Sequence, residues 1–274
     1  MRSKLFVPGA RPELFPKAFA SAADAVSIDL EDAVSEDNKS AARAHVVAFL
    51  GSDAAAGSGK VVIVRVNAAM SPHFEADLEL ARHARVALIN LPKVESPEDV
   101  EAAAARIGGA PKILANIETA AGVQRAAEIA AHPCVVGLQV GYVDLFESLG
   151  ADRRDAANVH AVMFAVRIAA ACSGKFAYDG AFPDVHDAAG FRAEALMARK
   201  LGFLGKSCIH PSQTPIANEV FAPNDAELAQ AERVLQAART RAGAFLLDGR
   251  MIDAPAIRRA EALLAAYGDR RIAR

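Results

Sequence analysis

Acidic side chains recur where short apolar runs of the sequence end, and they are the first candidates for chemistry. They are Asp29, Glu31, Asp32, Glu118, Asp144 and Asp179, and one arginine, Arg65, lies at the end of another such run. If these runs are neighbouring strands, the acids meet at one place and repel one another unless a cation neutralises them. Oxygen ligands without a His or Cys cluster suit Mg²⁺ rather than zinc. The pattern predicts a magnesium site, and the alternative is that these acids cap the helices that follow.

Eight apolar runs rich in β-branched residues alternate with longer helical patterns. The predicted strands are Lys4–Val7, Ala25–Leu30, Val61–Val66, Val86–Leu91, Lys112–Ile117, Val135–Val140, Lys175–Tyr178 and Gly205–Ile209. The predicted helices are Pro12–Ala22, Glu36–Leu50, His73–Arg82, Pro97–Ile107, Ala120–Ala131, Arg153–Ala171 and Asp187–Leu201. This alternation predicts an α/β fold, a (β/α)₈ TIM barrel over residues 1–222, whose chemistry lies at the carboxyl ends of the strands. An open doubly wound sheet is the main competitor, but no G-x-G-x-x-G follows any strand.

Residues 223–274 exceed what a barrel needs. They predict a helix over Pro223–Gly243, a hairpin in AFLLDGRMID about its Asp-Gly turn, and a last helix over Pro255–Tyr267. Such a C-terminal extension either packs on its own barrel or reaches a neighbouring subunit.

Composition narrows the class of protein. The chain has 274 residues, 53% of them hydrophobic, and a formal charge of −2. A nucleic-acid-binding protein usually carries a basic excess, and a disordered chain is less apolar. No apolar stretch approaches the roughly 18 residues of a membrane span, and the N-terminus lacks the apolar region of a signal peptide. Three cysteines without metal or disulfide spacing, expected to be buried, favour a reducing, cytoplasmic location.

Several motifs, in this order, resemble one known family. They are RSKLFVPGAR, DLEDAVSEDNKSAAR, VRVN, LPKVES, ANIETAAGV, GYVDL, GFLGKSCIHPSQ and DGRMIDAPAIRRA. The chain resembles the CitE-like branch of the HpcH/HpaI aldolase/citrate lyase family over nearly its whole length. The resemblance implies a TIM barrel in a homotrimer or hexamer. It also implies Mg²⁺-dependent cleavage of a 3-hydroxyacyl-CoA thioester into acetyl-CoA and a 2-oxo acid.

The resemblance assigns roles to the strand-end residues. Glu118 of IET and Asp144 of GYVD fall on the metal ligands, and Arg65 of RVN falls on a substrate-binding arginine that would stabilise an oxyanion. The residues alone leave alternatives open: Glu118 as the first acid of a helix, Asp144 as a helix cap, and Arg65 as a buried ion-pair partner. The acids that would hold metal-bound waters, or else cap the next helix, are Asp29, Glu31 and Asp32.

Other positions match contacts to the thioester. Phe6 corresponds to an aromatic residue that contacts the acyl-CoA, and Ile209 and His210 lie where relatives meet the thioester end. Asp253 matches a lid aspartate that acts as an acid or base in a neighbouring subunit's site, although it could simply cap the last helix. Glu13 departs from the basic residue of related citramalyl-CoA lyases. The basic residues that could replace that phosphate contact are Arg2, Lys4, Arg11 and Lys17.

Three other functions remain open at this point. A metal-dependent pyruvate-class aldolase would act on free hydroxy-oxo acids without CoA. A Schiff-base aldolase would need a desolvated lysine, for which Lys93 and Lys206 are candidates. A citrate lyase β-subunit would act only within a complex that carries the acyl group on a carrier protein. Which hydroxyacyl thioester is cleaved depends on pocket shape that the sequence does not reveal.

Overall fold

The structure, a computed structural model, describes residues 1–108, 111–241 and 243–267. The chain divides into two compact units, Met1–Phe221 and Ala222–Arg274. Among the described helices, none is long and apolar enough to cross a membrane.

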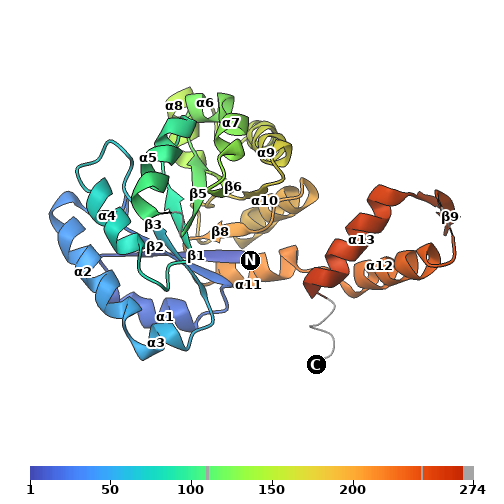
Figure 1. Cartoon of the computed structure of the whole chain (residues 1–274), viewed down its shortest axis with the longest axis horizontal. Coiled ribbons are helices and arrows are strands. Elements are labelled where there is room, and N and C mark those ends of the chain that lie inside the picture. Colours follow the sequence, from blue (N-terminus) through green and yellow to red (C-terminus); the bar gives the residue numbers. More distant parts are fainter. Residues whose placement is uncertain (109–110, 242, 268–274) are drawn as a thin grey trace. The chain divides into compact units, whose positions relative to one another are not determined.

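The first unit is built on eight parallel strands surrounded by helices, as Figure 1 shows. The strands are β1 Ser3–Pro8, β2 Ala25–Asp29, β3 Val61–Arg65, β4 Leu88–Leu91, β5 Lys112–Ile117, β6 Val135–Val140, β7 Phe176–Tyr178 and β8 Lys206–Cys208. They pair in the order β7-β6-β5-β4-β3-β2-β1-β8, and an isolated bridge between Asp179 and Lys206 joins the two ends. This ring is the predicted TIM barrel, and all eight predicted strands are present.

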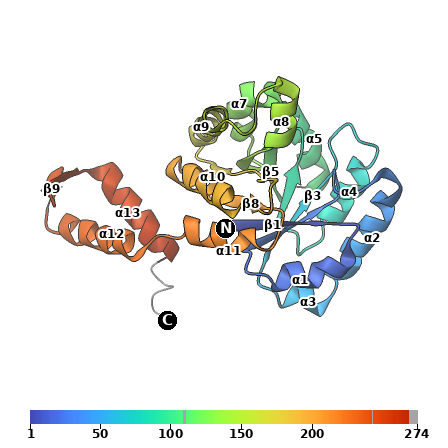
Figure 2. The same ribbon diagram turned by 180° about the vertical axis from the view of Figure 1, so that it is seen from behind.

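Helices connect successive strands around the outside of the barrel, and Figure 2 shows them from behind. The helices are η1 Pro12–Leu14, α1 Phe15–Ala20, η2 Glu36–Asn38, α2 Lys39–Leu50, α3 Asp53–Ala56, α4 Phe74–Ala81, α5 Pro97–Ile107, α6 Ala120–Gln124, α7 Ala126–Ala131, α8 Tyr142–Leu149, α9 Ala156–Cys172, α10 Ala188–Lys200 and α11 Gln213–Phe221. The predicted helix 120–131 is broken at Arg125, which leaves the helical region with φ −103°. Helices α3, α8 and α11 were not predicted, and α8 matters most because it carries Asp144.

The inside of the barrel is unusually polar. Strand register places Lys4 opposite Ser207, Asn90 opposite Leu114, and Asn116 opposite Gln139. These side chains share the inner face because side chains alternate between faces along each strand. The outer faces carry the apolar residues that pack under the helices, such as Val26, Ile28, Val64, Ile89 and Ile113. The polar interior leads directly to the mouth of the barrel, where strand ends present their acids.

Buried ion pairs join β7 and β8 in addition to the backbone bridge between Asp179 and Lys206. Lys206 Nζ is fully buried and donates to Asp179 Oδ2 at 2.7 Å and to Glu194 Oε1 of α10 at 2.7 Å. Asp179 Oδ1 also accepts from the hydroxyl of Tyr142 at 2.6 Å, at the start of α8. Asp179, predicted to face the mouth, is therefore committed to this network, because an ammonium buried beside it needs a counter-ion.

The second unit has its own small core. Helices α12 Asp225–Ala238 and α13 Ala254–Tyr267 pack side by side (Figure 2), and Ala231, Val234, Ile252 and Ala260 form the buried centre. Strands β9 Phe245–Leu247 and β10 Arg250–Ile252 pair as the predicted antiparallel hairpin. Its turn residues have φ 52° and 73°, the left-handed values that an Asp-Gly turn of type I′ requires.

The buried network between β7 and β8 predicts a large loss of stability on removal of its cation. Replacing Lys206 by Met removes the only cation paired with Asp179 among the described residues and one of the two paired with Glu194, so we expect the free energy of unfolding to fall by about 3–5 kcal/mol. Urea denaturation measures this change. Arg154→Met, which breaks an exposed pair with Asp152, is the control and should leave the midpoint unchanged. Equal effects of the two substitutions would contradict the assignment.

Candidate active site at the barrel mouth

The guanidinium of Arg65 is held in a fork at the carboxyl end of β3. Its Nε and Nη2 donate to the two oxygens of Asp29 on β2 at 2.7 and 2.6 Å, and Nη1 lies 3.0 Å from Glu31. Burial disfavours the charge of Arg65, but Asp29 and Glu31 outweigh it and raise its pKa further. The fork lies 5.2 Å from the ring of Phe6, so the aromatic residue predicted to meet the acyl-CoA is beside the predicted substrate arginine.

Glu31 and Asp32 lie on the loop after β2. They face a second cation, Lys93, which follows β4. Lys93 Nζ is 3.1 Å from Glu31, 3.8 Å from Asp32 and 3.8 Å from Asp144, so it bridges acids from two sides of the mouth. Lys93 has φ 50°, a left-handed backbone that is uncommon outside glycine. This conformation also directs its backbone N–H to Oε1 of Glu118 at 2.6 Å.

Glu118 points into the mouth and does not cap a helix. The next residue, Thr119, caps α6 by accepting from Gly122 N at 3.0 Å, which leaves the Glu118 carboxylate free of that role. Glu118 is 4% exposed, and its oxygens accept from Lys93 N and from Asn116 Nδ2. Burial, followed by the negative charge of Glu31, raises its pKa to about 8.

Asp144 lies in the first turn of α8, and its side chain is 35% exposed toward the mouth. It is not the N-cap of α8, since that position is Gly141. Gly141 is needed for close approach: a Cβ there would overlap the side chain of Glu118. The two predicted metal ligands therefore belong to neighbouring strand ends that a glycine allows to come together.

The donor set fits a hard divalent cation. The described residues contain no group of three or more His, Cys, Asp or Glu side chains already gathered around one point. Mg²⁺ however needs only one or two protein carboxylates, with waters and substrate oxygens supplying the rest. Burial and then the negative charge of Glu31 raise the pKa of Glu118 and so disfavour its ionised form, which a cation held by Glu118 and Asp144 would favour.

Residues Ile209 and His210 follow β8 and are exposed. The backbone N–H of Ile209 donates to Gln213 Oε1 at 2.9 Å, and His210 Nδ1 lies 2.8 Å from Ser212 Oγ. Both residues are thus available on the loop that precedes α11. Contact with a thioester remains a prediction for them.

Asp253 belongs to the second unit and caps α13. Its Oδ1 accepts from Ala256 N at 3.3 Å and its carbonyl accepts from Ile257 N at 3.0 Å, which is the simpler of the two roles considered for it. An additional catalytic role stays a prediction, because it depends on where this unit sits in the assembled protein.

The structure corrects the expectations for two basic residues and one cysteine. Lys4 cannot replace a CoA phosphate contact, because it is fully buried inside the barrel. Arg2 is bound to Asp24 by two side-chain hydrogen bonds of 3.0 and 2.8 Å, at the amino end of β1, away from the mouth. Cys172 is exposed, in contrast to the expectation that every cysteine is buried.

The two Schiff-base candidates are held as ammonium groups. Burial opposes the charge of Lys206, yet Asp179 and Glu194 outweigh burial and raise its pKa. The pKa of Lys93 is raised in the same way by Glu31. A nucleophilic lysine must be deprotonated, so this environment disfavours imine chemistry.

Some functional side chains were missed by sequence reasoning. Lys39 Nζ donates to the carbonyls of Leu30 and Glu31 at 2.8 and 2.7 Å, and to Asn67 Oδ1 at 2.7 Å, and so holds the acidic loop in place. Lys93 was considered only as a nucleophile. The residues around Lys39 and Lys93 in the sequence carry no signal that separates these supporting roles from ordinary surface positions.

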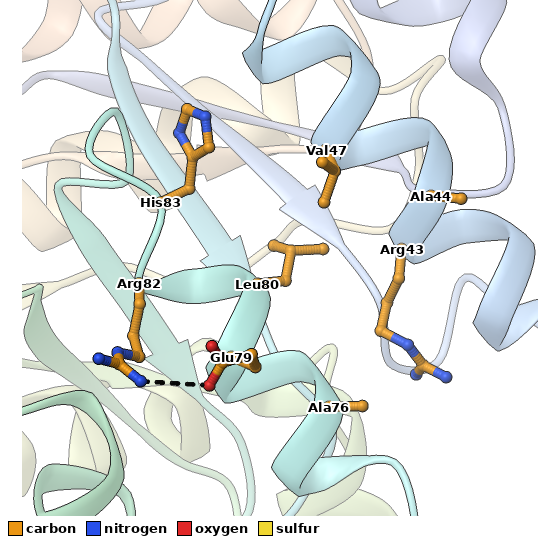
Figure 3. A pocket seen from close by; sticks show the side chains of 8 residues that line it. All are labelled: Arg43, Ala44, Val47, Ala76, Glu79, Leu80, Arg82 and His83. Carbon is orange, nitrogen blue, oxygen red and sulfur yellow. Dashed lines mark hydrogen bonds and ion pairs between the residues drawn. The ribbon is translucent and has the colours of Figure 1, made fainter.

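A second concave region lies between α2 and α4 and is separate from the mouth (Figure 3). It has a volume of about 580 Å³, and Val47 and Leu80 point toward each other across it. None of the predicted site residues lines this groove. The mouth of the barrel is therefore the candidate active site.

Comparisons with known proteins show which family the chain is related to. Residues 2–211 match the HpcH/HpaI aldolase/citrate lyase family model. The chain belongs to this family. It is 38% identical to a (3S)-malyl-CoA thioesterase of Cereibacter sphaeroides, over 92% of this chain and 89% of that protein. It is 35% identical to an L-malyl-CoA/beta-methylmalyl-CoA lyase of the same species, over 96% of this chain and 93% of that protein.

A solved structure is similar throughout its length. The crystal structure of CitE from Mycobacterium tuberculosis with magnesium, acetoacetate and coenzyme A superposes with a TM-score of 0.82. The two chains are 36% identical, and the match covers 98% of this chain and 100% of the other. Magnesium bound to this family member agrees with the predicted cofactor, Mg²⁺.

The raised pKa of Glu118 predicts a pH-dependent stability in the absence of metal. Between about pH 4.5 and pH 8 the folded protein holds a proton that the unfolded chain has released, so stability falls as pH rises through this window. We expect a loss of about 2–4 kcal/mol across the window for the protein in a chelator. Urea unfolding at several pH values measures it.

The matched variant for this experiment is Glu118→Gln, which has the same shape but no titrating proton. Its stability should fall less than that of the wild type over the same range of pH, because the contribution of Glu118 is gone. Parallel profiles for the wild type and the variant would show that Glu118 is not the group responsible.

Proposed function

We propose that this protein is a Mg²⁺-dependent carbon–carbon lyase that cleaves a 3-hydroxyacyl-CoA thioester into acetyl-CoA and a 2-oxo acid. The observation that carries the proposal is that Glu118, Asp144 and Arg65 come close enough at the barrel mouth for the charges of Asp144 and Arg65 to act on Glu118. The match to CitE bound to magnesium and coenzyme A, and to a malyl-CoA lyase, supports the substrate class. The citramalyl, malyl and citryl thioesters are the candidate substrates.

Glu118 and Asp144 would hold the magnesium ion, and Glu31 and Asp32 would orient its waters. When bound, the ion supplies Lewis acidity that favours loss of the substrate hydroxyl proton. Arg65 offers its remaining N–H groups to the oxyanion that develops on the thioester as the bond breaks. Its guanidinium is already fixed by Asp29, so little reorganisation is needed at that moment.

Asp253 is the group that we propose to protonate the enolate carbon and so complete acetyl-CoA. It lies in the C-terminal unit, which we propose acts as a lid over the site of a neighbouring subunit in a homotrimer or hexamer. Proton transfer requires a group within hydrogen-bond reach of the carbon, and the acids at the mouth are engaged by cations.

Hydrolysis of the thioester is the second candidate, because one relative is named a malyl-CoA thioesterase. The two reactions differ in their products. A lyase releases acetyl-CoA and a 2-oxo acid, whereas a thioesterase releases free CoA and leaves the hydroxy acid intact. The citrate lyase β-subunit alternative would require a carrier-protein thioester in place of CoA.

The decisive experiment is a panel of hydroxyacyl-CoA thioesters incubated with the protein and Mg²⁺. We expect acetyl-CoA and a 2-oxo acid by mass spectrometry, with turnover lost in a chelator and reduced about 100-fold or more in Glu118→Ala. Free CoA with an intact hydroxy acid would favour the thioesterase. Activity on free hydroxy-oxo acids without CoA would favour the pyruvate-class aldolase.

The role of Asp253 is tested by Asp253→Asn. Asparagine caps a helix as well as aspartate does, so α13, the fold and Mg²⁺ binding should be unchanged while lyase turnover is lost. Turnover and calorimetric Mg²⁺ titration are measured on the same preparation, and light scattering reports whether it is a trimer or hexamer. Wild-type turnover in the variant would remove Asp253 from the mechanism.

A further inference from the structure

A chain of buried hydrogen bonds runs from Lys4 to Glu118 through the inside of the barrel. Lys4 Nζ donates to Gln139 Oε1, Gln139 Nε2 donates to Asn116 Oδ1 at 3.0 Å, and Asn116 Nδ2 donates to Glu118 Oε2. All four side chains are at most 4% exposed. This hydrogen-bond chain crosses from β1 to β6 and β5, and it ends on Glu118, the proposed metal ligand.

Both ends of the chain dictate the same direction of donation. A carboxylate only accepts, so Asn116 must present its NH₂ group to Glu118, and its oxygen then faces Gln139. At the other end Lys4 Nζ donates to Gln139 Oε1, so Gln139 turns its NH₂ group to Asn116. Burial, followed by the charge of Arg65, lowers the pKa of Lys4 well below its usual range, so the lysine acts here as a hydrogen-bond donor rather than as an ion-pair partner. Lys4 thus reinforces, from the far end, the orientation that the Glu118 carboxylate requires of both amides.

The position of Lys4 is costly without such a role. Its amine is fully buried, and burial, followed by the charge of Arg65, lowers its pKa well below the usual range. Its other neighbours are the rings of Phe6 and Tyr178, at 4.4 and 5.4 Å from Nζ. An apolar side chain of similar length would avoid the cost of desolvating an amine at this place.

We propose that Lys4 is a positioning residue that holds Glu118 in its metal-binding orientation through Gln139 and Asn116. This inference rests on the proposed function, in that Glu118 is taken to bind the metal. Lys93 N fixes one oxygen of Glu118 and the chain fixes the other, so the carboxylate is held from two sides. Partners of this kind typically change metal affinity by about 10–100-fold.

The test is Mg²⁺ binding measured by calorimetric titration of the whole protein, with Mn²⁺ as a second probe. Lys4→Met should weaken binding by about 10–100-fold, because Gln139 then loses its donor and the two amides hold Glu118 Oε2 less firmly. The same variant should melt at the wild-type temperature or above it, because methionine replaces a buried amine by an apolar group of similar length. A merely structural lysine would instead lower the melting temperature and leave affinity unchanged.

A second variant removes another hydrogen bond of the same chain. It keeps the proposal testable if Lys4→Met fails to fold. Gln139→Leu should weaken Mg²⁺ binding by a similar factor, and the double variant should be no weaker than the weaker single variant, because both act on one chain. Tyr178→Phe is the matched control, since Tyr178 contacts Lys4 but lies outside the chain, and its affinity should equal that of the wild type.

Glu118→Ala separates the two possible failures. If it weakens Mg²⁺ binding while Lys4→Met and Gln139→Leu do not, the positioning role is overturned and the metal site stands. If Glu118→Ala leaves binding unchanged, Glu118 is not a ligand, and both the proposed metal site and the role of Lys4 are overturned. Additive losses of Mg²⁺ affinity in the double variant would also overturn the proposal that Lys4 and Gln139 act through one hydrogen-bond chain.

Discussion

Repulsion among carboxylates at the barrel mouth is the constraint on which the rest of this structure depends. Asp29 and Glu31 lie at the end of β2, Glu118 follows β5 and Asp144 follows β6, and all four side chains belong to the mouth of the barrel. Arg65 and Lys93 offset part of the charge, and the shifted pKa of Glu118 shows that the offset is incomplete. A site in this state is prepared for a divalent cation, because the unfavourable charge is already fixed by the fold.

Polar side chains support the mouth from both sides of the barrel wall. Some of them lie inside, where a barrel usually has aliphatic layers. Lys39 holds the loop that carries Glu31 from outside, and Asn116 reaches Glu118 from inside. Tyr142, at the start of the helix that carries Asp144, is tied to Asp179 at the junction of β7 and β8. Closure of the barrel and placement of the site are thus linked through shared side chains, and the outer apolar shell supplies the burial that holds them.

Much of the fold is predictable because parallel strands covered on both sides have a strong local signature. All eight strands were expected from apolar runs, and the Asp-Gly hairpin from its turn residues. Helices α8 and α11, of eight and nine residues, were missed. Asp179 was expected at the mouth because it follows a strand, but the pairing with Lys206 depends on β8, which lies in a different part of the sequence.

The sequence by itself determined the barrel, the family and the residues that meet at the strand ends, because strand periodicity and motif order are local properties. Only the tertiary structure decided how those residues are partnered. It showed that Thr119 rather than Glu118 caps α6, that Lys93 bridges acids from both sides, and that Lys4 lies inside the barrel. Such partners come from segments far apart in the chain, and burial and charge, not spacing, select them.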